Sequence, residues 1–138
     1  MKKVLFVCTH NAGRSQMAEA FFSKMVKGRA EGTSAGTQPS DKVNPVVVEA
    51  MREVGIDISR KKPKMLTLEM IESVDRVITM GCGAEGVCPA SFVPTEDWQL
   101  DDPDGKSIEQ VRQIRDEVKS RVEKLIKELG IGTYFTKI

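Results

Sequence analysis

The sequence predicts a single α/β domain over residues 1–138, in which a four-stranded, doubly wound parallel sheet is flanked by helices. Short apolar segments alternate with helical patterns along the chain, and no internal repeat, low-complexity tract or linker interrupts them. The first and third strand candidates are continuously apolar, as buried parallel strands are. Right-handed crossovers between such strands produce a doubly wound sheet whose ligands lie at the carboxyl ends of the strands.

Four segments have the composition of strands. They are Lys3 to Val7, Ala30 to Ala35, Arg76 to Met80 and a shorter piece around Ser91 to Val93. Each is separated from the next by residues with a helical pattern or by turn residues. The sequence therefore predicts one sheet with helical crossovers.

Helices are expected between these strands. The first begins directly after Arg14, and its apolar positions recur at helical spacing. Those positions are Ala18, Phe21, Phe22 and Met25. A second helix has Asn44 as its N-cap and Pro45 in first position, and it ends at Gly55. Thr67 is expected to begin a short third helix.

The last helix has the most regular pattern. Ser107 and Gln110 are spaced as a capping box, and Gly130 is placed to end the helix. Its apolar stripe consists of Val111, Ile114, Val118, Val122, Leu125 and Leu129. This stripe predicts that the helix packs on the sheet.

Composition excludes several classes of partner. Lys and Arg number 21 against 20 Asp and Glu, a balance that gives no basis for binding nucleic acid or an anionic membrane. The apolar run from Val4 to Val7 is far shorter than a signal-peptide core or a membrane span. We therefore expect a soluble, cytoplasmic protein. A monomer is the expected oligomeric state, although neither composition nor charge determines it. Three cysteines are an odd number in a chain large enough to form a core, which favours reactive rather than structural thiols.

A candidate nucleophile lies between the first strand and the first helix. Cys8 stands six residues before Arg14, so a loop, a helix N-terminus and a permanent cation coincide around one sulfur. Both the helix end and the guanidinium favour the thiolate, and the Ser15 hydroxyl is placed to hydrogen-bond it. The alternative, a buried cysteine beside an unrelated surface arginine, does not account for this coincidence.

The loop has the composition of an oxyanion cradle. Its residues are Thr9, His10, Asn11, Ala12 and Gly13. Their N–H groups and the planar guanidinium of Arg14 would hold a phosphate-like or arsenate ion with the sulfur facing its central atom. Gly13 permits close approach of the backbone, and Asn11 tolerates positive φ. His10 is expected to contribute mainly its backbone amide.

Asp102 is the candidate acid. Releasing an oxygen at neutral pH needs a proton donor, and Pro103 restricts the backbone of Asp102 towards an extended shape. The alternative is that Asp101, Asp102 and Asp104 are only turn residues before a helix. Trp98 is expected to pack against this loop.

Two further thiols follow the third strand. Cys82 and Cys88 would share the rim of the sheet with Cys8, and three intervening or adjacent glycines would let the segment fold back. A relay in which Cys82 reaches Cys8 and then Cys88 is chemically feasible, since disulfide exchange requires access by a thiolate. A zinc knuckle is the alternative, but the spacing is too long and a second ligand pair is missing from the sequence.

These motifs together resemble the thioredoxin-coupled arsenate reductases, which share the fold of low-molecular-weight protein tyrosine phosphatases. The matching segments are Cys8 to Glu19, Ser34 to Gly36, Asn44-Pro45, Gly55 to Ile58, Cys82 with Cys88-Pro89, and Asp102-Pro103. The resemblance covers Lys3 to about Leu129. It implies that Cys8 attacks arsenate, that Arg14 and the loop amides hold its oxygens, and that Ser15 supports the thiolate. Asp102 would protonate the departing hydroxide.

The resemblance also implies the fate of the Cys8 adduct. Cys82 would attack Cys8 and release arsenite, and Cys88 would then attack Cys82 to leave a disulfide for thioredoxin. No tightly bound cofactor is expected, and glutaredoxin or a low-molecular-weight thiol is an alternative reductant.

Potassium is a further point of comparison, because some relatives use this ion near the loop. Asn11, Glu19 and Ser34 match part of that site, whereas Lys64 falls where an acidic ligand is expected. The substitution counts against potassium dependence.

Two other functions use the same residues. A phosphatase would employ Cys8, Arg14 and Asp102 through a phosphocysteine and would need neither Cys82 nor Cys88. Against it, Asp104 and Gly105 follow the Asp-Pro pair where tyrosine phosphatases of this fold place aromatic residues. The other alternative is a non-catalytic oxyanion or redox sensor.

Overall fold

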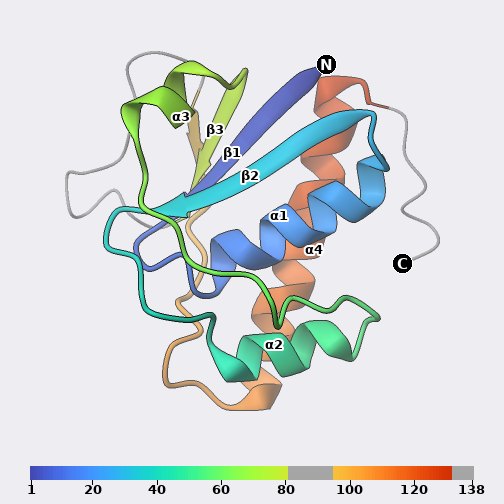
Figure 1. The fold of residues 1–138 in the computed structure, drawn as a ribbon. Coiled ribbons are helices and arrows are strands. Elements are labelled where there is room, and N and C mark those ends of the chain that lie inside the picture. The colour runs from blue at the N-terminus through green and yellow to red at the C-terminus, as the bar shows by residue number, and fades with distance from the viewer. Residues whose placement is uncertain (81–94, 132–138) are drawn as a thin grey trace.

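The computed structural model describes residues 1–80 and 95–131, and it confirms the predicted α/β class with a four-stranded parallel sheet (Figure 1). In chain order the elements are β1 (Lys2–Cys8), α1 (Arg14–Val26), β2 (Ala30–Gly36), α2 (Pro45–Arg52), α3 (Leu68–Glu72), β3 (Arg76–Thr79), β4 (Thr95–Asp97) and α4 (Ile108–Leu129).

The sheet has the strand order β2-β1-β3-β4, and all three strand pairs are parallel. Cys8 lies opposite Gly36, and Val7 lies opposite Thr79. The carboxyl ends of β1, β2 and β3 therefore meet at one edge of the sheet, and β1 delivers Cys8 to that edge. The strand predicted around Ser91 to Val93 lies outside the described residues, and β4 begins at Thr95.

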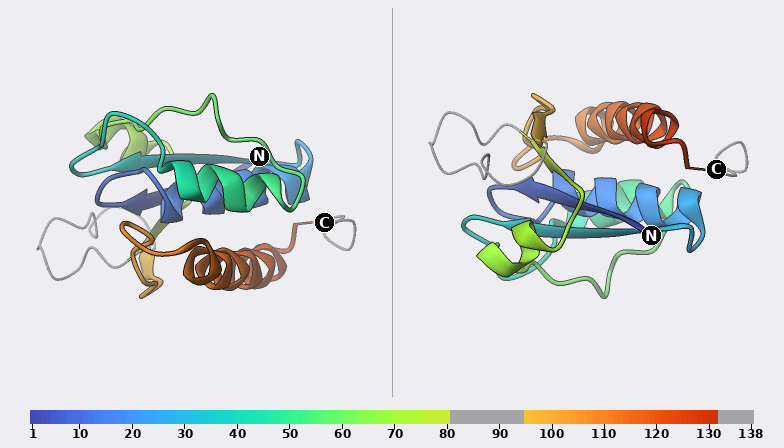
Figure 2. Two further views of the ribbon diagram at one scale, coloured as in Figure 1. Left: turned by 90° about the horizontal axis from the view of Figure 1, so that it is seen from below. Right: turned by 90° about the horizontal axis from the view of Figure 1, so that it is seen from above.

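Helices cover both faces of the sheet (Figure 2), and alternate residues of β1 belong to two different apolar clusters. Val4 and Phe6 belong to the larger cluster, which includes buried residues of α1, α2 and α4. Leu5 and Val7 belong to the smaller cluster, which includes Ile71 of α3. Because side chains alternate along a strand, both faces of β1 are buried, and this explains its continuous apolar run.

The predicted packing role of Trp98 is confirmed. Its side chain is buried in the larger cluster, and its ring centroid lies 6.0 Å from that of Phe6. Phe6 in turn makes an edge contact with Phe22 at 5.7 Å. These rings anchor the beginning of the segment that leads to Asp102.

The predicted helix starts are confirmed by their side-chain caps. Asn44 accepts a hydrogen bond from the N–H of Val46, Thr67 does so from Met70, and Ser107 forms the full capping box with Gln110.

Two helix ends differ in how well they match the sequence pattern. Gly130 is the left-handed C-cap of α4, as expected. By contrast, α2 ends at Arg52 rather than Gly55, because Gly55 and Ile56 donate back to Arg52 and Met51 in a terminal turn. Gly55 has a φ of 82°, so the glycine is needed in this turn. Within residues 1–80 and 95–131, none of the helices is both long and apolar enough to cross a bilayer.

Candidate active site

The loop between β1 and α1 turns its carbonyl groups towards the segment that leads from β2 to α2. The carbonyl oxygens of Cys8, Thr9, His10 and Ala12 accept hydrogen bonds from the N–H groups of Thr37, Gln38, Ser40 and Asn44, respectively, at 2.8 to 3.3 Å. In the described part of the chain, no backbone carbonyl accepts a hydrogen bond from the N–H groups of Ala12, Gly13 and Arg14. These amides, at the start of α1, are therefore available to an anion.

Cys8 is 2% exposed, and its sulfur has two polar partners. The N–H of Asn11 donates to Sγ at 3.2 Å, and the Ser15 hydroxyl lies 2.8 Å from Sγ. Both contacts stabilise a thiolate more than a neutral thiol if the hydroxyl is the donor.

Asn11 decides the direction of that hydroxyl. Its Oδ1 accepts a hydrogen bond from the backbone N–H of Lys64 at 2.9 Å, and a backbone N–H can only donate. The opposite end of the amide, Nδ2, consequently donates to the Ser15 hydroxyl oxygen at 2.7 Å. Because the Ser15 oxygen accepts the hydrogen bond from Asn11, the hydroxyl hydrogen is free to point at the sulfur of Cys8.

The conformation of the loop depends on the same asparagine. Asn11 has a φ of 50°, in the left-handed region, as the residue type suggested. The buried Gln16 donates from Nε2 to both the carbonyl and the Oδ1 of Asn11, each at 3.1 Å. Gln16 was not among the predicted site residues, although it follows the loop directly in the sequence.

Arg14 connects the loop to the segment that carries the candidate acid. Its side chain is 8% exposed, Nη1 donates to the carbonyl of Leu100 at 3.1 Å, and Nη2 lies 3.8 Å from Oδ2 of Asp102. Asp102 is about half exposed, and its Oδ1 accepts the N–H of Asp104 in an Asx turn. The structure thus brings the predicted cation and acid to one place, while the chemical role of Asp102 stays a prediction.

Gly13 is needed for contact between the two loops. A Cβ atom built at this position would lie 2.6 Å from Cγ of Pro103, much closer than real Cβ contacts allow. The expected reason for the glycine was close approach of the ligand. The structure adds a second reason, which is that Pro103, next to Asp102, packs directly on the backbone at Gly13.

A cavity of about 360 Å³ opens above Cys8. Arsenate needs roughly 120 Å³ if each of its four oxygens takes the volume of a water molecule, about 30 Å³. The cavity is therefore larger than the ion and falls in the size range of sites for small organic ligands.

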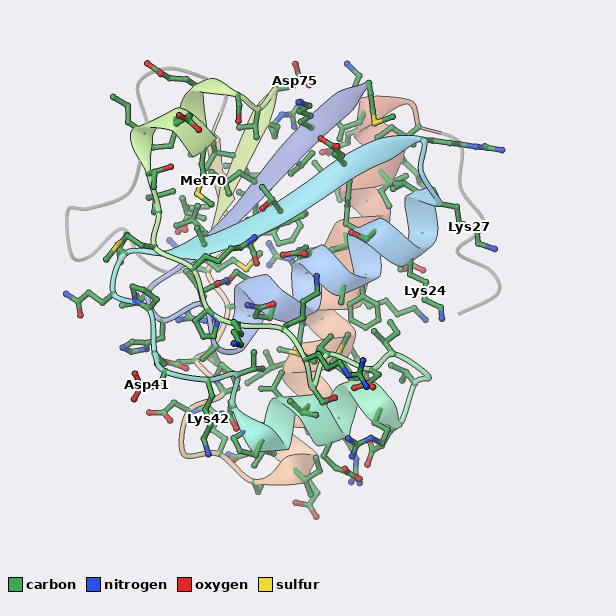
Figure 3. All side chains as sticks on the ribbon, viewed as in Figure 1. Lys24, Lys27, Asp41, Lys42, Met70 and Asp75 are labelled. Carbon is green, nitrogen blue, oxygen red and sulfur yellow. The ribbon has the colours of Figure 1, made fainter. Side chains whose placement is uncertain are left out.

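Two lysines that the sequence analysis missed line this cavity. Lys42 lies on the segment between β2 and α2, where Figure 3 labels it, and Lys106 lies just before α4. His10 is exposed and also lines the cavity. No local sequence pattern distinguishes Lys42 or Lys106 from the other lysines of this chain.

Two predicted residues lie outside the described part of the chain, namely Cys82 and Cys88. The described chain reaches Met80, whose N–H donates to the carbonyl of Val7 at 2.9 Å. Met80 therefore lies directly beside the end of the strand that carries Cys8. Within residues 1–80 and 95–131, we find no group of three histidine, cysteine or acidic side chains arranged to hold a metal ion.

The comparisons with known proteins agree with this geometry. The profile of the family described as low molecular weight phosphotyrosine protein phosphatase matches residues 3–132. The glutaredoxin arsenate reductase of Synechocystis is 44% identical over 134 residues, which are 94% of this chain and 100% of that protein.

Solved structures show the same likeness. A structure described as an arsenate reductase in the phosphate binding state has a TM-score of 0.81 and 43% identity, over 93% of this chain and 98% of the other. A thioredoxin-dependent arsenate reductase of Corynebacterium glutamicum has a TM-score of 0.81 and 39% identity, over 94% of this chain and 62% of that chain. The chain thus belongs to the low-molecular-weight phosphotyrosine protein phosphatase family, alongside its arsenate reductases.

Proposed function

We propose that this protein reduces arsenate to arsenite, with Cys8 as the nucleophile. The observation that carries the proposal is the environment of one sulfur. Cys8 is buried, receives an N–H and a hydroxyl, and faces a cavity bordered by Arg14 and by loop amides that have no backbone acceptor among residues 1–80 and 95–131. This is an arrangement for a thiolate that attacks a bound tetrahedral oxyanion.

The first step forms a covalent adduct. The amides of Ala12 and Gly13 and the guanidinium of Arg14 hold three arsenate oxygens, and the Cys8 thiolate attacks arsenic. A sulfur–arsenic bond forms while one arsenic–oxygen bond breaks, and the departing oxygen leaves as water after Asp102 supplies a proton. Arsenic remains in its pentavalent state in this step.

The second step transfers electrons. The Cys82 thiolate attacks the sulfur of Cys8, a disulfide forms, and the electron pair of the sulfur–arsenic bond stays on arsenic, which leaves as trivalent arsenite. Cys88 then attacks Cys82 and frees the Cys8 thiolate. Cys82 follows Met80 by two residues, at most about 7 Å of extended chain, which supports its access to the end of β1.

The resulting disulfide between Cys82 and Cys88 needs an external dithiol. We assign this role to thioredoxin, on the motifs of the sequence and the likeness to the thioredoxin-dependent enzyme of Corynebacterium glutamicum. The likeness to a glutaredoxin arsenate reductase makes glutaredoxin the alternative to be tested.

The test measures arsenite release with thioredoxin, thioredoxin reductase and NADPH, and in parallel with glutaredoxin and glutathione. Cys8→Ser should abolish both adduct formation and turnover. Cys82→Ser should stop at the Cys8 adduct, and Cys88→Ser should stop at the disulfide between Cys8 and Cys82 after releasing one arsenite. Neither variant should turn over. Normal turnover by Cys82→Ser would refute the relay, and equal rates with both reductants would refute the specific assignment to thioredoxin.

Phosphatase activity is a second candidate function, favoured by the size of the cavity. Its 360 Å³ leaves room for an organic substituent on a bound phosphate. We expect slow hydrolysis of para-nitrophenyl phosphate that requires Cys8 but is unaffected in Cys82→Ser. Hydrolysis much faster than arsenate reduction would make the phosphatase the main function.

A further inference from the structure

The described residues do not fit the potassium site that the resemblance suggests. Glu19 is occupied on both oxygens, since Oε1 accepts the hydroxyl of Ser34 at 2.6 Å and Oε2 accepts the ammonium of Lys61 at 2.8 Å. Of the other two candidate ligands, Ser34 uses its hydroxyl hydrogen on Glu19, and Oδ1 of Asn11 accepts the backbone N–H of Lys64 at 2.9 Å and Nε2 of Gln16 at 3.1 Å. A free cation would have to displace these donors.

Charge and burial make the ion pair with Lys61 the important contact. The Glu19 side chain is 9% exposed, and a carboxylate buried to this degree needs a cation or several hydrogen bonds. Lys61 is about half exposed, and its ammonium lies 2.8 Å from Oε2 of this carboxylate. A potassium ion at the same carboxylate would be repelled by this ammonium.

The ion pair lies at the start of a segment, residues 61–64, that is hydrogen-bonded to the thiol loop, residues 9–13 between β1 and α1, and to the end of β2. Nε2 of Gln16 is 3.4 Å from the carbonyl of Lys62. The N–H of Lys64 donates to Asn11, and its carbonyl accepts the N–H of Gly36 at 2.8 Å. Lys61 is thus three residues from the N–H that orients Asn11, which in turn directs the Ser15 hydroxyl towards Cys8.

We propose that Lys61 is a tethered cation, a positioning residue whose ammonium takes the place of a dissociable monovalent cation beside the thiol loop. Its charge compensates Glu19 and holds residues 61–64 where the N–H of Lys64 fixes the amide of Asn11. The thiolate state of Cys8 is consequently independent of potassium. The inference deepens the proposed function but concerns the resting loop, so it is tested without arsenate.

The test compares Lys61→Met with Lys64→Met in a Cys82→Ser/Cys88→Ser background, where Cys8 is the only thiol. Lys64→Met is the matched control, because it removes only an exposed bond to Thr33 and keeps its backbone N–H. The rate of Cys8 alkylation against pH reports the thiolate. The midpoint of thermal unfolding shows whether the variant is still stably folded. The alkylation rate and this midpoint are each measured in potassium chloride and in choline chloride at equal ionic strength.

In the background protein, the rate of Cys8 alkylation and the midpoint of thermal unfolding should be the same in the two salts. In choline, Lys61→Met should alkylate about two- to tenfold more slowly near neutral pH, the effect of about one hydrogen bond, and potassium should restore part of the loss. Lys61→Arg and Lys64→Met should match the background. Potassium activation of the background protein, or equal behaviour of Lys61→Met and Lys64→Met, would overturn the proposal.

Discussion

Charged side chains gather both beside the thiol loop and at the contact between α2 and α4, but they are paired much more closely at the contact between the helices. In the contact between the helices, Glu53 receives Arg112 at 2.7 and 2.9 Å and Arg115 at 3.0 Å, so every charge has a close partner. Beside the loop, Arg14 is buried, yet its guanidinium has within the described residues one backbone acceptor and one carboxylate, the latter only at 3.8 Å.

This difference separates a structural charge cluster from a binding site. The guanidinium of Arg14 and the amides of the loop retain hydrogen-bonding capacity for a ligand, whereas the cluster at Glu53 uses its capacity internally. The hydrogen bond from Arg112, aided by Arg115, lowers the pKa of Glu53 from 4.5 to about 2. Mutations in the loop should therefore impair activity, and mutations in the cluster should impair stability.

The largest expected effect is that of Arg14→Lys. Lysine keeps the charge but loses the planar fork, so kcat/KM for arsenate should fall by about 10²- to 10³-fold. Steady-state arsenite release measures the loss, and the thermal midpoint should change little. A variant that retains activity within about threefold of wild type would show that the fork is not needed.

Gly13→Ala should have a smaller effect on the same reaction. The new methyl group would clash with Pro103 and shift the segment that carries Asp102, which should lower kcat by about ten- to a hundredfold. The double variant Gly13→Ala/Pro103→Ala tests the cause, because removing the proline ring atoms should recover part of the activity. If the double variant were no more active than Gly13→Ala, the loss would come from a change in the backbone of the loop and not from the clash with Pro103.

Glu53→Gln should change stability and leave kcat/KM unaltered. Because the pKa of Glu53 is lower in the folded protein, its contribution is complete above pH 4.5 and is lost as the pH falls from 4.5 towards 2. The variant should unfold more easily in denaturant at pH 7 and show a shallower loss of stability across this acidic range. If the free energy of unfolding fell with pH as steeply in the variant as in the wild type, the ion pairs of Glu53 with Arg112 and Arg115 would not contribute to stability.

The smallest effect is expected for Arg121→Gln on the exposed face of α4. Arg121 and Glu117 form an ion pair at 2.8 Å, but both side chains are more than a third exposed. Such pairs contribute about 0.5 kcal/mol or less, and less still in high salt. Urea unfolding at low and high ionic strength measures this, and a loss above about 1 kcal/mol would contradict it.

Features that depend on residues close together in the sequence were predicted well, and features that depend on residues far apart in the sequence were predicted poorly. The caps at Asn44, Thr67 and Ser107 depend on hydrogen bonds to residues two or three positions away, so the sequence pattern was sufficient. The apolar run of β1 likewise reported burial on both faces. The strand β4 has the residues Thr95 to Asp97, which are exposed and polar, so no pattern of burial indicated it.

The candidate site shows the same division. The spacing of Cys8 and Arg14 predicted a loop followed by a helix, and the structure has that arrangement. The partners of Arg14 on the distant segment at Leu100 and Asp102 were only partly foreseen, and Lys61 was missed altogether. Lys61 reaches Glu19 across 42 positions, and an exposed lysine has no sequence feature that reveals such a contact.

The amino-acid order alone determined the α/β class, the helix boundaries set by caps, and the placement of a thiol and an arginine around a helix N-terminus. These depend on local backbone geometry and on the alternation of apolar side chains. Only the tertiary structure decided which N–H groups remain free for a ligand, where the acid loop meets Gly13, and which lysine compensates Glu19. Those features arise from contacts between residues far apart in the chain, where the balance of burial and hydrogen bonding depends on the packed whole.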